Sequence, residues 1–400
     1  MGKAKVSERM SKLWKLRGFY LFLGLAGGMF GPYLSLLLVH NGLESGTVGM
    51  VMAAGTLIAI LFQPAWGIIA DRYQQTRLVL ILSVAVPAAL AVFYRSEAWL
   101  VLTLVYTLST IFSSTQAPIA DSYAIAAAKS AGSTYGSIRL MMSLGAALGG
   151  YAGGLYVAGY SVSSIWLPFL VFNTFALAIA CSLPKKAEEN HMMSQSFAQG
   201  VKQLIGSRIF LAFLGGSFLV NQTMTAFGTY FVLAFRSVGG ATDQAGIALM
   251  LASVTNVPSM LFASQVIRKI GREKTLLAGA LIYVLRWAIQ VAFPYPSVMI
   301  GVQVLHGLSF GLFYIAAVEY VSQITSPEMQ STGQSVFNMV FTGLAGIVGN
   351  LLNGYLLEGG GVEMMNAACM ISSAAGAGLL FYVARGTRRL AAPVPREPGV

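Results

Sequence analysis

The sequence Gly-Ile-Ile-Ala-Asp-Arg-Tyr-Gln-Gln-Thr-Arg, residues 67–77, decides the fold. It is a short polar segment that separates two long apolar runs. Asp71, Arg72 and Arg77 interrupt sequence that is otherwise almost free of charge on both sides. A charged side chain costs roughly 2.5–3.5 kcal/mol at the centre of a membrane helix, so charges gather in the connections between such helices. The segment is therefore interpreted as a connection between two membrane-spanning helices.

The composition indicates a membrane protein over the whole chain. Of the 400 residues, 56% are hydrophobic and 10% are charged, whereas soluble domains carry about 25% charge. A soluble fold of this size has too little interior to bury so much apolar surface, and apolar runs of about 18 or more residues are typical of helices that cross a bilayer. The sequence predicts an all-α polytopic membrane protein surrounded by lipid.

Apolar runs divide the chain into two similar halves. Twelve runs are present, at 18–39, 46–70, 78–94, 98–125, 137–159, 163–183, 208–235, 244–267, 275–293, 297–322, 330–356 and 364–384. The longest internal polar stretch follows the sixth run. We therefore expect a six-helix bundle at 1–183, a cytoplasmic linker at 184–207, a second six-helix bundle at 208–385 and a disordered cytoplasmic tail at 386–400.

The net charge of the chain is strongly basic, at +11. In a soluble protein this charge would suggest a nucleic-acid partner. Here most Lys and Arg residues fall on alternate connections, beginning with the N-terminal segment, and cytoplasmic loops of membrane proteins show the same excess. The pattern predicts that both termini are cytoplasmic, that the chain is a multi-pass protein of a bacterial-type inner membrane, and that it binds no nucleic acid.

A second polar segment repeats the position of the first. Ile-Arg-Lys-Ile-Gly-Arg-Glu-Lys, residues 267–274, follows the second helix of the second half, as 67–77 follows the second helix of the first half. Two parallel six-helix halves around a central site are a transporter architecture. We therefore expect one central site that is exposed to each side of the membrane in turn, with a small molecule as its substrate.

Ionisable residues inside the apolar runs are candidates for function, because they are costly there. Asp121 in the fourth run and Arg139 at the start of the fifth both lie toward the expected cytoplasmic side. A carboxylate beside a guanidinium can hold a polar solute through charge-assisted hydrogen bonds. The carboxylate could also exchange a proton when the arginine moves away. The alternative is a structural ion pair at the inner rim.

A second group of polar residues lies near mid-depth in the second half. Arg286 and Gln290 share one face of the ninth run, and His306 lies in the tenth. Histidine titrates near neutral pH, which suits proton transfer, although His306 could instead be a hydrogen-bonded packing residue. Glu319, farther along the tenth run, is the third candidate for proton coupling, with an interfacial charge partner as its alternative.

Two amides complete the candidate set for substrate binding. Asn221 lies in the seventh run and Asn256 in the eighth, and polar packing between helices is the alternative for each. The sequence offers no cofactor or metal site, because the two cysteines lack CxxC spacing and the three histidines form no HExxH motif. An intramembrane enzyme or a receptor is the weaker alternative, since no nucleophile and base cluster and no soluble domain is present.

At residues 67–77 the chain resembles the major facilitator superfamily. In that family the connection between helices 2 and 3 reads Gly-x-x-x-Asp-Arg/Lys, followed by basic residues. Gly67, Asp71, Arg72 and Arg77 match this motif, and Gln74 replaces the usual second glycine. The resemblance extends over all twelve predicted helices. It implies that the segment latches the cytoplasmic side of the first bundle in one access state.

Other stretches narrow the resemblance to the lactose permease branch. They are Leu-Phe-Gln-Pro-Ala-Trp-Gly (61–67), Ala-Pro-Ile-Ala-Asp (117–121) and Tyr-Gly-Ser-Ile-Arg (135–139). Two further stretches, Leu-Arg-Trp (285–287) and Val-Gln-Val-Leu-His (302–306), are similar to the phenylpropionate permease group within that branch. The resemblance implies that Asp121 and Arg139 correspond to the sugar-gripping pair. It also implies that Arg286 and His306 correspond to the arginine and histidine near the proton site.

Three positions depart from lactose permease. Ser309 stands where a proton-carrying glutamate would follow the histidine, Ser253 lies near the position of a second essential glutamate, and Ala146 replaces the sugar-stacking tryptophan. The departures argue against a galactoside. The sequence predicts a monomeric, proton-coupled symporter of a small polar or aromatic solute, such as a sugar, a nucleoside or an aromatic acid. The alternative is a proton antiporter that exports drugs or sugars.

Overall fold

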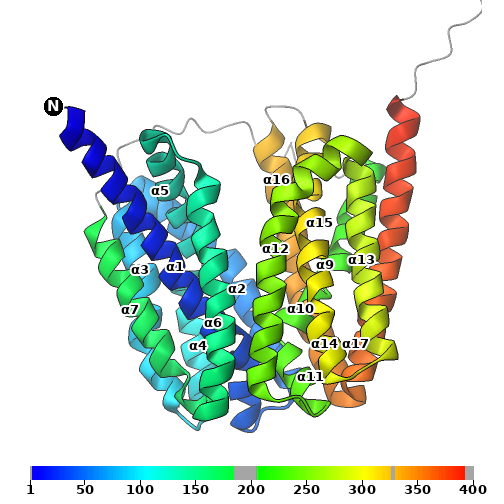
Figure 1. Ribbon diagram of the computed structural model, residues 1–400, viewed down its shortest axis with the longest axis horizontal. Coiled ribbons are helices and arrows are strands. Elements are labelled where there is room, and N and C mark those ends of the chain that lie inside the picture. The colour runs from blue at the N-terminus through cyan, green and yellow to red at the C-terminus, as the bar shows by residue number, and fades with distance from the viewer. Residues whose placement is uncertain (1, 184–203, 205, 326–328, 392–400) are drawn as a thin grey trace, which may run out of the picture.

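The computed structural model describes residues 2–183, 204, 206–325 and 329–391. Every regular element in this part of the chain is a helix, so the predicted all-α class is confirmed. The helices stand side by side in two groups, with α3 and α7 at one edge of the molecule and α13 and α17 at the other (Figure 1). In lipid the backbone has no water to bond, so long apolar segments form helices that satisfy their own N–H and C=O groups.

The described elements lie in two stretches of the chain, one on each side of residues 184–203. The first half contains α1 (Gly2–His40), α2 (Ser45–Arg72), α3 (Thr76–Leu90), η1 (Ala91–Arg95), α4 (Trp99–Ser113), α5 (Gln116–Ala131), α6 (Tyr135–Gly159), η2 (Val162–Ser164) and α7 (Trp166–Ser182). The second half contains α9 (Arg208–Asn221), α10 (Met224–Gly228), α11 (Phe231–Ser237), α12 (Thr242–Ile270), α13 (Arg272–Ala292), α14 (Pro296–Gly301), α15 (Gln303–Ile324), α16 (Gln330–Asn338), the π-helix η4 (Met339–Leu344) and α17 (Ala345–Ala391).

The described helices account for the twelve predicted crossings. Eleven helical segments are long and apolar enough to span a membrane, and the last of them, Thr332–Gly386, has 55 residues. Such a length is too great for one crossing, which takes about 20 residues. Gly361 interrupts α17 with a non-helical backbone (φ 66°, ψ −164°) that glycine adopts readily. The chain turns there, so this segment crosses twice and both described ends of the chain lie at the same end of the molecule (Figure 1).

Two of the expected boundaries differ from the structure. Helix α17 continues to Ala391, beyond the expected boundary at 385, and residues 392–400 of the expected tail lie outside the described residues. Most of the expected linker, 184–207, also lies outside them. The segment 67–77 is shorter as a connection than predicted, because α2 continues through Arg72 and α3 begins at Thr76.

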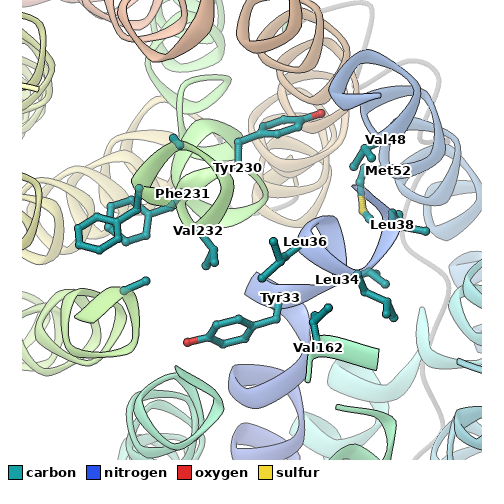
Figure 2. Close-up of a cluster of buried hydrophobic side chains, with 14 of the residues drawn as sticks. Tyr33, Leu34, Leu36, Leu38, Val48, Met52, Val162, Tyr230, Phe231 and Val232 are labelled. Atoms are coloured by element: carbon teal, nitrogen blue, oxygen red, sulfur yellow. The ribbon is translucent and has the colours of Figure 1, made fainter. Parts of the chain in front are cut away.

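Buried side chains form a separate core in each half and one core that both halves share. One cluster draws only on residues 13–183 and another only on residues 204–383. The third, here called the shared core, combines both halves, and Figure 2 shows Tyr33, Leu36 and Val48 of the first half beside Tyr230 and Val232 of the second. The shared core lies at the end of the molecule opposite the described chain ends, and we call this the closed end (Figure 1).

Polar contacts also join the two halves at the closed end. The carboxylate Oε2 of Glu358 in α17 accepts a hydrogen bond from the backbone N–H of Gly46, at 2.7 Å, in the first turn of α2. A carboxylate is favoured at a helix N-terminus, where backbone N–H groups are unpaired. The hydroxyl of Ser35 donates to the carbonyl of Thr229 in the other half. The halves are therefore held together by directional bonds as well as by apolar packing.

Glycines allow α1 and α6 to approach at backbone distance within the first half. A Cβ atom on Gly24 would lie 2.3 Å from the carbonyl oxygen of Met142, and a Cβ on Gly145 would lie 2.2 Å from that of Leu21. Gly27, one turn along α1 from Gly24, has no heavy atom within 4 Å of the corresponding point. Small residues of this kind let membrane helices pack closely.

We expect Gly145→Ala to destabilise the protein, because the added methyl group forces α1 and α6 apart. Overpacking a tight contact costs about 1–3 kcal/mol, which lowers the melting temperature of the detergent-solubilised protein by several degrees. Gly27→Ala is the matched control and should change the free energy of unfolding by no more than about 1 kcal/mol. Equal effects of the two substitutions would contradict the packing assigned to Gly145.

Candidate functional site

The pair Asp121 and Arg139 is brought together as the sequence predicts. Asp121 lies in α5 and Arg139 in α6, and the two helices are antiparallel because the chain turns at Gly132, whose φ is 64°. The Thr134 side chain accepts a bond from the Ser137 N–H and begins α6. Nη1 of Arg139 lies 3.6 Å from Oδ1 of Asp121. The turn and the cap therefore set the position of the ion pair.

Tyr20 adds an aromatic hydroxyl to this pair. Its O–H donates a hydrogen bond to Oδ1 of Asp121, and its ring lies 5.9 Å from the guanidinium carbon of Arg139. The side chains of Arg139 and Asp121 are 41% and 30% exposed, so both charges remain accessible to a solute. We call Tyr20, Asp121 and Arg139 the first cluster.

The first cluster faces the second half of the chain. Tyr314 of α15 interacts electrostatically with both Asp121 and Arg139. Tyr135 of α6 interacts with Asp121 from the first half. A carboxylate, a guanidinium and several phenol groups can bind hydroxyl, amide or charged groups of a solute through charge-assisted hydrogen bonds. The arrangement suits a polar solute held between the two halves.

Arg286 is buried in the second half, away from solvent. Its side chain is 0% exposed, and Nη2 donates to Oε1 of Gln303 at 3.3 Å. Its guanidinium carbon lies 4.4 Å from the centre of the Trp287 ring and 5.1 Å from that of Phe227. Cations are attracted to the faces of aromatic rings. The arginine is thus held between two rings and an amide.

His306 and Gln290 lie in the same buried region. The His306 ring is centred 3.9 Å from the Phe227 ring, and the hydroxyl of Ser309 donates to the His306 backbone carbonyl at 3.0 Å. Gln290 is 1% exposed. We call Arg286, Gln290, Gln303 and His306 the second cluster. Among the described residues no hydrogen bond or ion pair connects it with the first cluster.

The other candidates occupy separate places. Oε2 of Glu319 lies 3.7 Å from Nε of Arg272 at the start of α13, and both side chains are about one-third exposed. Nδ2 of Asn221 donates to the carbonyl of Phe341 at 2.5 Å, which uses this amide for packing between helices. Oδ1 of Asn256 is buried and has no hydrogen-bond partner in the described part of the chain.

The gating residues suggested by the motif lie at the end of α2 and the start of α3. Arg77 donates to the backbone carbonyl of Cys181 at the end of α7, which joins two helices of the same half. Gly67 and Arg72 lie within α2. Asp71 is also in α2, but its side chain lies outside the described part of the structure.

Some aromatic residues in or against the two clusters escape sequence reasoning. Tyr20 is one of 17 tyrosines in the chain and Phe227 is one of 23 phenylalanines. Neither residue belongs to a charged or polar sequence pattern. Their roles depend on contacts with residues far away in the sequence, such as Asp121 for Tyr20. No local signal distinguishes them from aromatic residues that pack against lipid.

Comparison with known proteins identifies relatives over most of the chain. The model of the family described as MFS_1 like family matches residues 13–366. The maltose permease of Geobacillus stearothermophilus is 30% identical over 362 residues, which cover 88% of this chain and 90% of the permease. The uncharacterized transporter YwbF of Bacillus subtilis is 27% identical over 376 residues, which cover 93% of this chain and 94% of that protein.

A solved structure confirms the fold. The crystal structure of a variant of the nucleoside transporter NupG matches with a TM-score of 0.81 at 16% identity, over 94% of this chain and 99% of the transporter. This likeness concerns the fold alone. The family match and the maltose permease identity go further, because each extends over more than half of the chain. The chain therefore belongs to the MFS_1-like family, and it is a multi-pass membrane transporter of the major facilitator superfamily, not an enzyme.

Proposed function

We propose that this transporter is a proton-coupled symporter that imports a small polar or aromatic solute through the first cluster. The ion pair of Asp121 and Arg139 carries this proposal, because both charges are accessible and Tyr314 of the other half lies within range of electrostatic interaction with them. Relatives of the chain are named for sugars, nucleosides, an aromatic acid and drugs. A sugar, a nucleoside or an aromatic acid would each find hydrogen-bond partners among these groups.

Asp121 is the proposed carrier of the proton. Its carboxylate accepts a hydrogen bond from Tyr20 and pairs with Arg139. A solute that draws Arg139 away removes the neighbouring positive charge and leaves the carboxylate free to exchange a proton. One charge that moves through the membrane potential contributes about 2.3 kcal/mol per 100 mV. Binding of the solute and of the proton are thereby coupled at a single pair.

His306 and Glu319 are the other residues proposed for proton coupling. His306 is 7% exposed and packs on Phe227, an environment that favours the packing role over proton transfer. Glu319 is paired with Arg272, which supports its alternative as an interfacial charge partner. We therefore rank both residues below Asp121 as candidates for proton coupling. Arg286, Gln290, Asn221 and Asn256 belong to the proposed set of substrate-binding residues, with Asn221 weakened by its bond to Phe341.

Alternating access is supported by the uneven contact between the halves. The halves share a core at the closed end, whereas the remaining buried clusters each belong to one half. We propose that the closed end faces outward and that both termini are cytoplasmic, in the inner membrane of a bacterium, with the monomer as the working unit. The segment Gly67, Asp71, Arg72 and Arg77 would then lie on the cytoplasmic side and take part in gating.

The proposed function is tested by ligand screening followed by transport. Sugars, nucleosides and aromatic acids are screened by thermal shift on the purified protein, and stabilising compounds are then offered to proteoliposomes with and without an imposed pH gradient. We expect accumulation that follows the pH gradient and collapses with a protonophore. Uptake that is indifferent to the gradient would remove the symport proposal.

Export by proton antiport is the second candidate, because one fold serves both directions. Some relatives of the chain are named as multidrug efflux pumps. The same proteoliposomes distinguish the two mechanisms. A symporter accumulates solute on the proton-poor side of the membrane, and an antiporter accumulates solute on the proton-rich side. Accumulation on the proton-rich side would favour the antiporter.

A further inference from the structure

Arg286 carries a charge that the described protein residues do not neutralise. The ion pairs in this part of the chain join Asp121 with Arg139 and Arg272 with Glu319. Among the described residues, the Arg286 guanidinium donates one hydrogen bond to Gln303, lies against the faces of two aromatic rings, and interacts electrostatically with the neutral side chains of Tyr283 and Cys369. A guanidinium keeps its proton in proteins, so the second cluster holds a fully buried positive charge.

Polar groups around this charge also lack protein partners. Nε and Nη1 of Arg286, Nε2 of Gln290 and Nδ1 of His306 have no hydrogen-bond partner among the described residues. Gln290 lies about one turn along α13 from Arg286, and His306 interacts with Arg286 electrostatically. Guanidinium and amide nitrogens are donors, and an imidazole nitrogen is a donor in one of its two tautomers. Unsatisfied donors therefore gather around one cation.

The helix that faces Arg286 does not provide an acid. Helix α15 presents Gln303 to Arg286, then His306 and Ser309, and its acidic residue Glu319 is paired with Arg272. A buried charge is costly unless it is paired and hydrogen-bonded. Water can accept hydrogen bonds from the free N–H groups, but it leaves the positive charge uncompensated. An anion would satisfy both the donors and the charge.

We infer that Arg286, Gln290 and His306 form a binding site for a small monovalent anion, either the carboxylate of a transported solute or free chloride. One guanidinium balances a single negative charge, and a doubly charged group would leave an excess charge in a buried site. The rings of Trp287 and Phe227 flank the site with apolar surface, which suits the hydrocarbon part of a carboxylic acid. The solute arm of this inference rests on the proposed function; the chloride arm does not.

Trp287 provides a direct reporter, because its ring lies 4.4 Å from the guanidinium carbon. Tryptophan emission of the purified protein is followed while chloride replaces gluconate at constant ionic strength, and in a second titration with 3-phenylpropionate against neutral 3-phenylpropanol. We expect a saturable change with at least one anion, no change with the alcohol, and loss of the signal in Trp287→Phe. The same anion should raise the melting temperature, since a ligand of the native state stabilises it.

Variants separate binding from structural effects. Arg286→Gln should weaken anion binding about tenfold or more, because it removes a charge-assisted bond, whereas Arg286→Lys keeps the charge and should retain part of the affinity. The matched control is Arg268→Gln, an exposed arginine at the end of α12, which should bind like the wild type. Arg139→Gln should lose solute transport and keep the anion response, so failure of the proposed function and failure of this inference are distinguishable.

The outcomes decide between the sources of the anion. If chloride binds and 3-phenylpropionate does not displace it, the site is one for free chloride. If the carboxylate displaces chloride, the site binds the carboxylate of a transported solute. The inference is overturned if wild-type protein shows no saturable response to either anion in fluorescence and in melting temperature. It is also overturned if folded Arg286→Gln binds the anion as tightly as the wild type does.

Discussion

Substitution of Asp121 with Asn should abolish proton-driven accumulation of the solute. The amide keeps the size of the carboxylate but cannot carry a proton, and it leaves Arg139 without its charged partner. Removing one partner of a hydrogen-bonded charge pair costs about 2–5 kcal/mol when the pair is buried, and less where solvent reaches it. Because proton coupling is lost in addition, we expect initial uptake under a pH gradient to fall at least about 100-fold.

The measurement is uptake in proteoliposomes, with exchange of labelled for unlabelled solute as a second readout. Arg139→Gln should lose both activities, because the guanidinium holds the solute. Glu319→Gln breaks an ion pair of similar length and exposure, at 3.7 Å, and tests a residue ranked below Asp121 for proton coupling: if Asp121 carries the proton and Glu319 is an interfacial charge partner, accumulation should stay within a few-fold of the wild type. Normal accumulation in both Asp121→Asn and Arg139→Gln would rule out the first cluster as the site.

Asp121 and Glu319 together show which features of the site the sequence could predict. Charge inside an apolar run identifies Asp121, Arg139, Arg286 and Glu319 as exceptional, because the cost of burying a charge is a property of the residue alone. The polarity pattern likewise predicts the helices and their two-fold division, since hydrophobic length determines a crossing. These features are local, and the structure confirms the all-α class and the pairing of Asp121 with Arg139.

Features that depend on contact between distant residues escape the sequence. The bond between Glu358 and the Gly46 N–H joins the two halves across most of the chain, and no periodicity indicates it. The sequence leaves open whether Glu319 carries a proton or is an interfacial charge partner. Its pairing with Arg272, which favours the second role, becomes visible only in the three-dimensional structure. The end of the last helix is a further example: α17 extends to Ala391, beyond the boundary expected at 385, and helix ends are less sharply marked in a sequence than helix interiors.

Gly154→Val should shift the transporter away from the conformation described here. At the closed end α6 lies against α12, and a Cβ atom on Gly154 would be 2.8 Å from both the Cα of Gly246 and the carbonyl oxygen of Thr242. These are backbone atoms of the other half, so the contact cannot be relieved by a side-chain rotation. Overpacking of about 1–3 kcal/mol corresponds to a change of about 5- to 150-fold in the ratio of two conformations.

The shift is measured as access to a cysteine at the closed end. Leu249 is 6% exposed, and its Cβ lies 3.1 Å from the point that a Cβ on Gly150 would occupy. It is replaced by cysteine in a Cys181→Ser background, because Cys181 is exposed whereas Cys369 is buried. Maleimide should label this cysteine faster when Gly154→Val is added, and solute uptake should fall in parallel.

Gly159→Val is the matched control on the same helix, because no atom lies within 4 Å of a Cβ at that position. It should leave labelling and uptake as they are. The decisive observation is the difference between the two variants, since both add the same side chain to α6. If Gly154→Val leaves the labelling rate and uptake unchanged while the protein remains folded, then contact between α6 and α12 does not restrict access at the closed end. If it only lowers the melting temperature, Gly154 serves packing alone, and the conformational equilibrium depends on the remaining contacts between the halves, including the bond from Gly46 to Glu358.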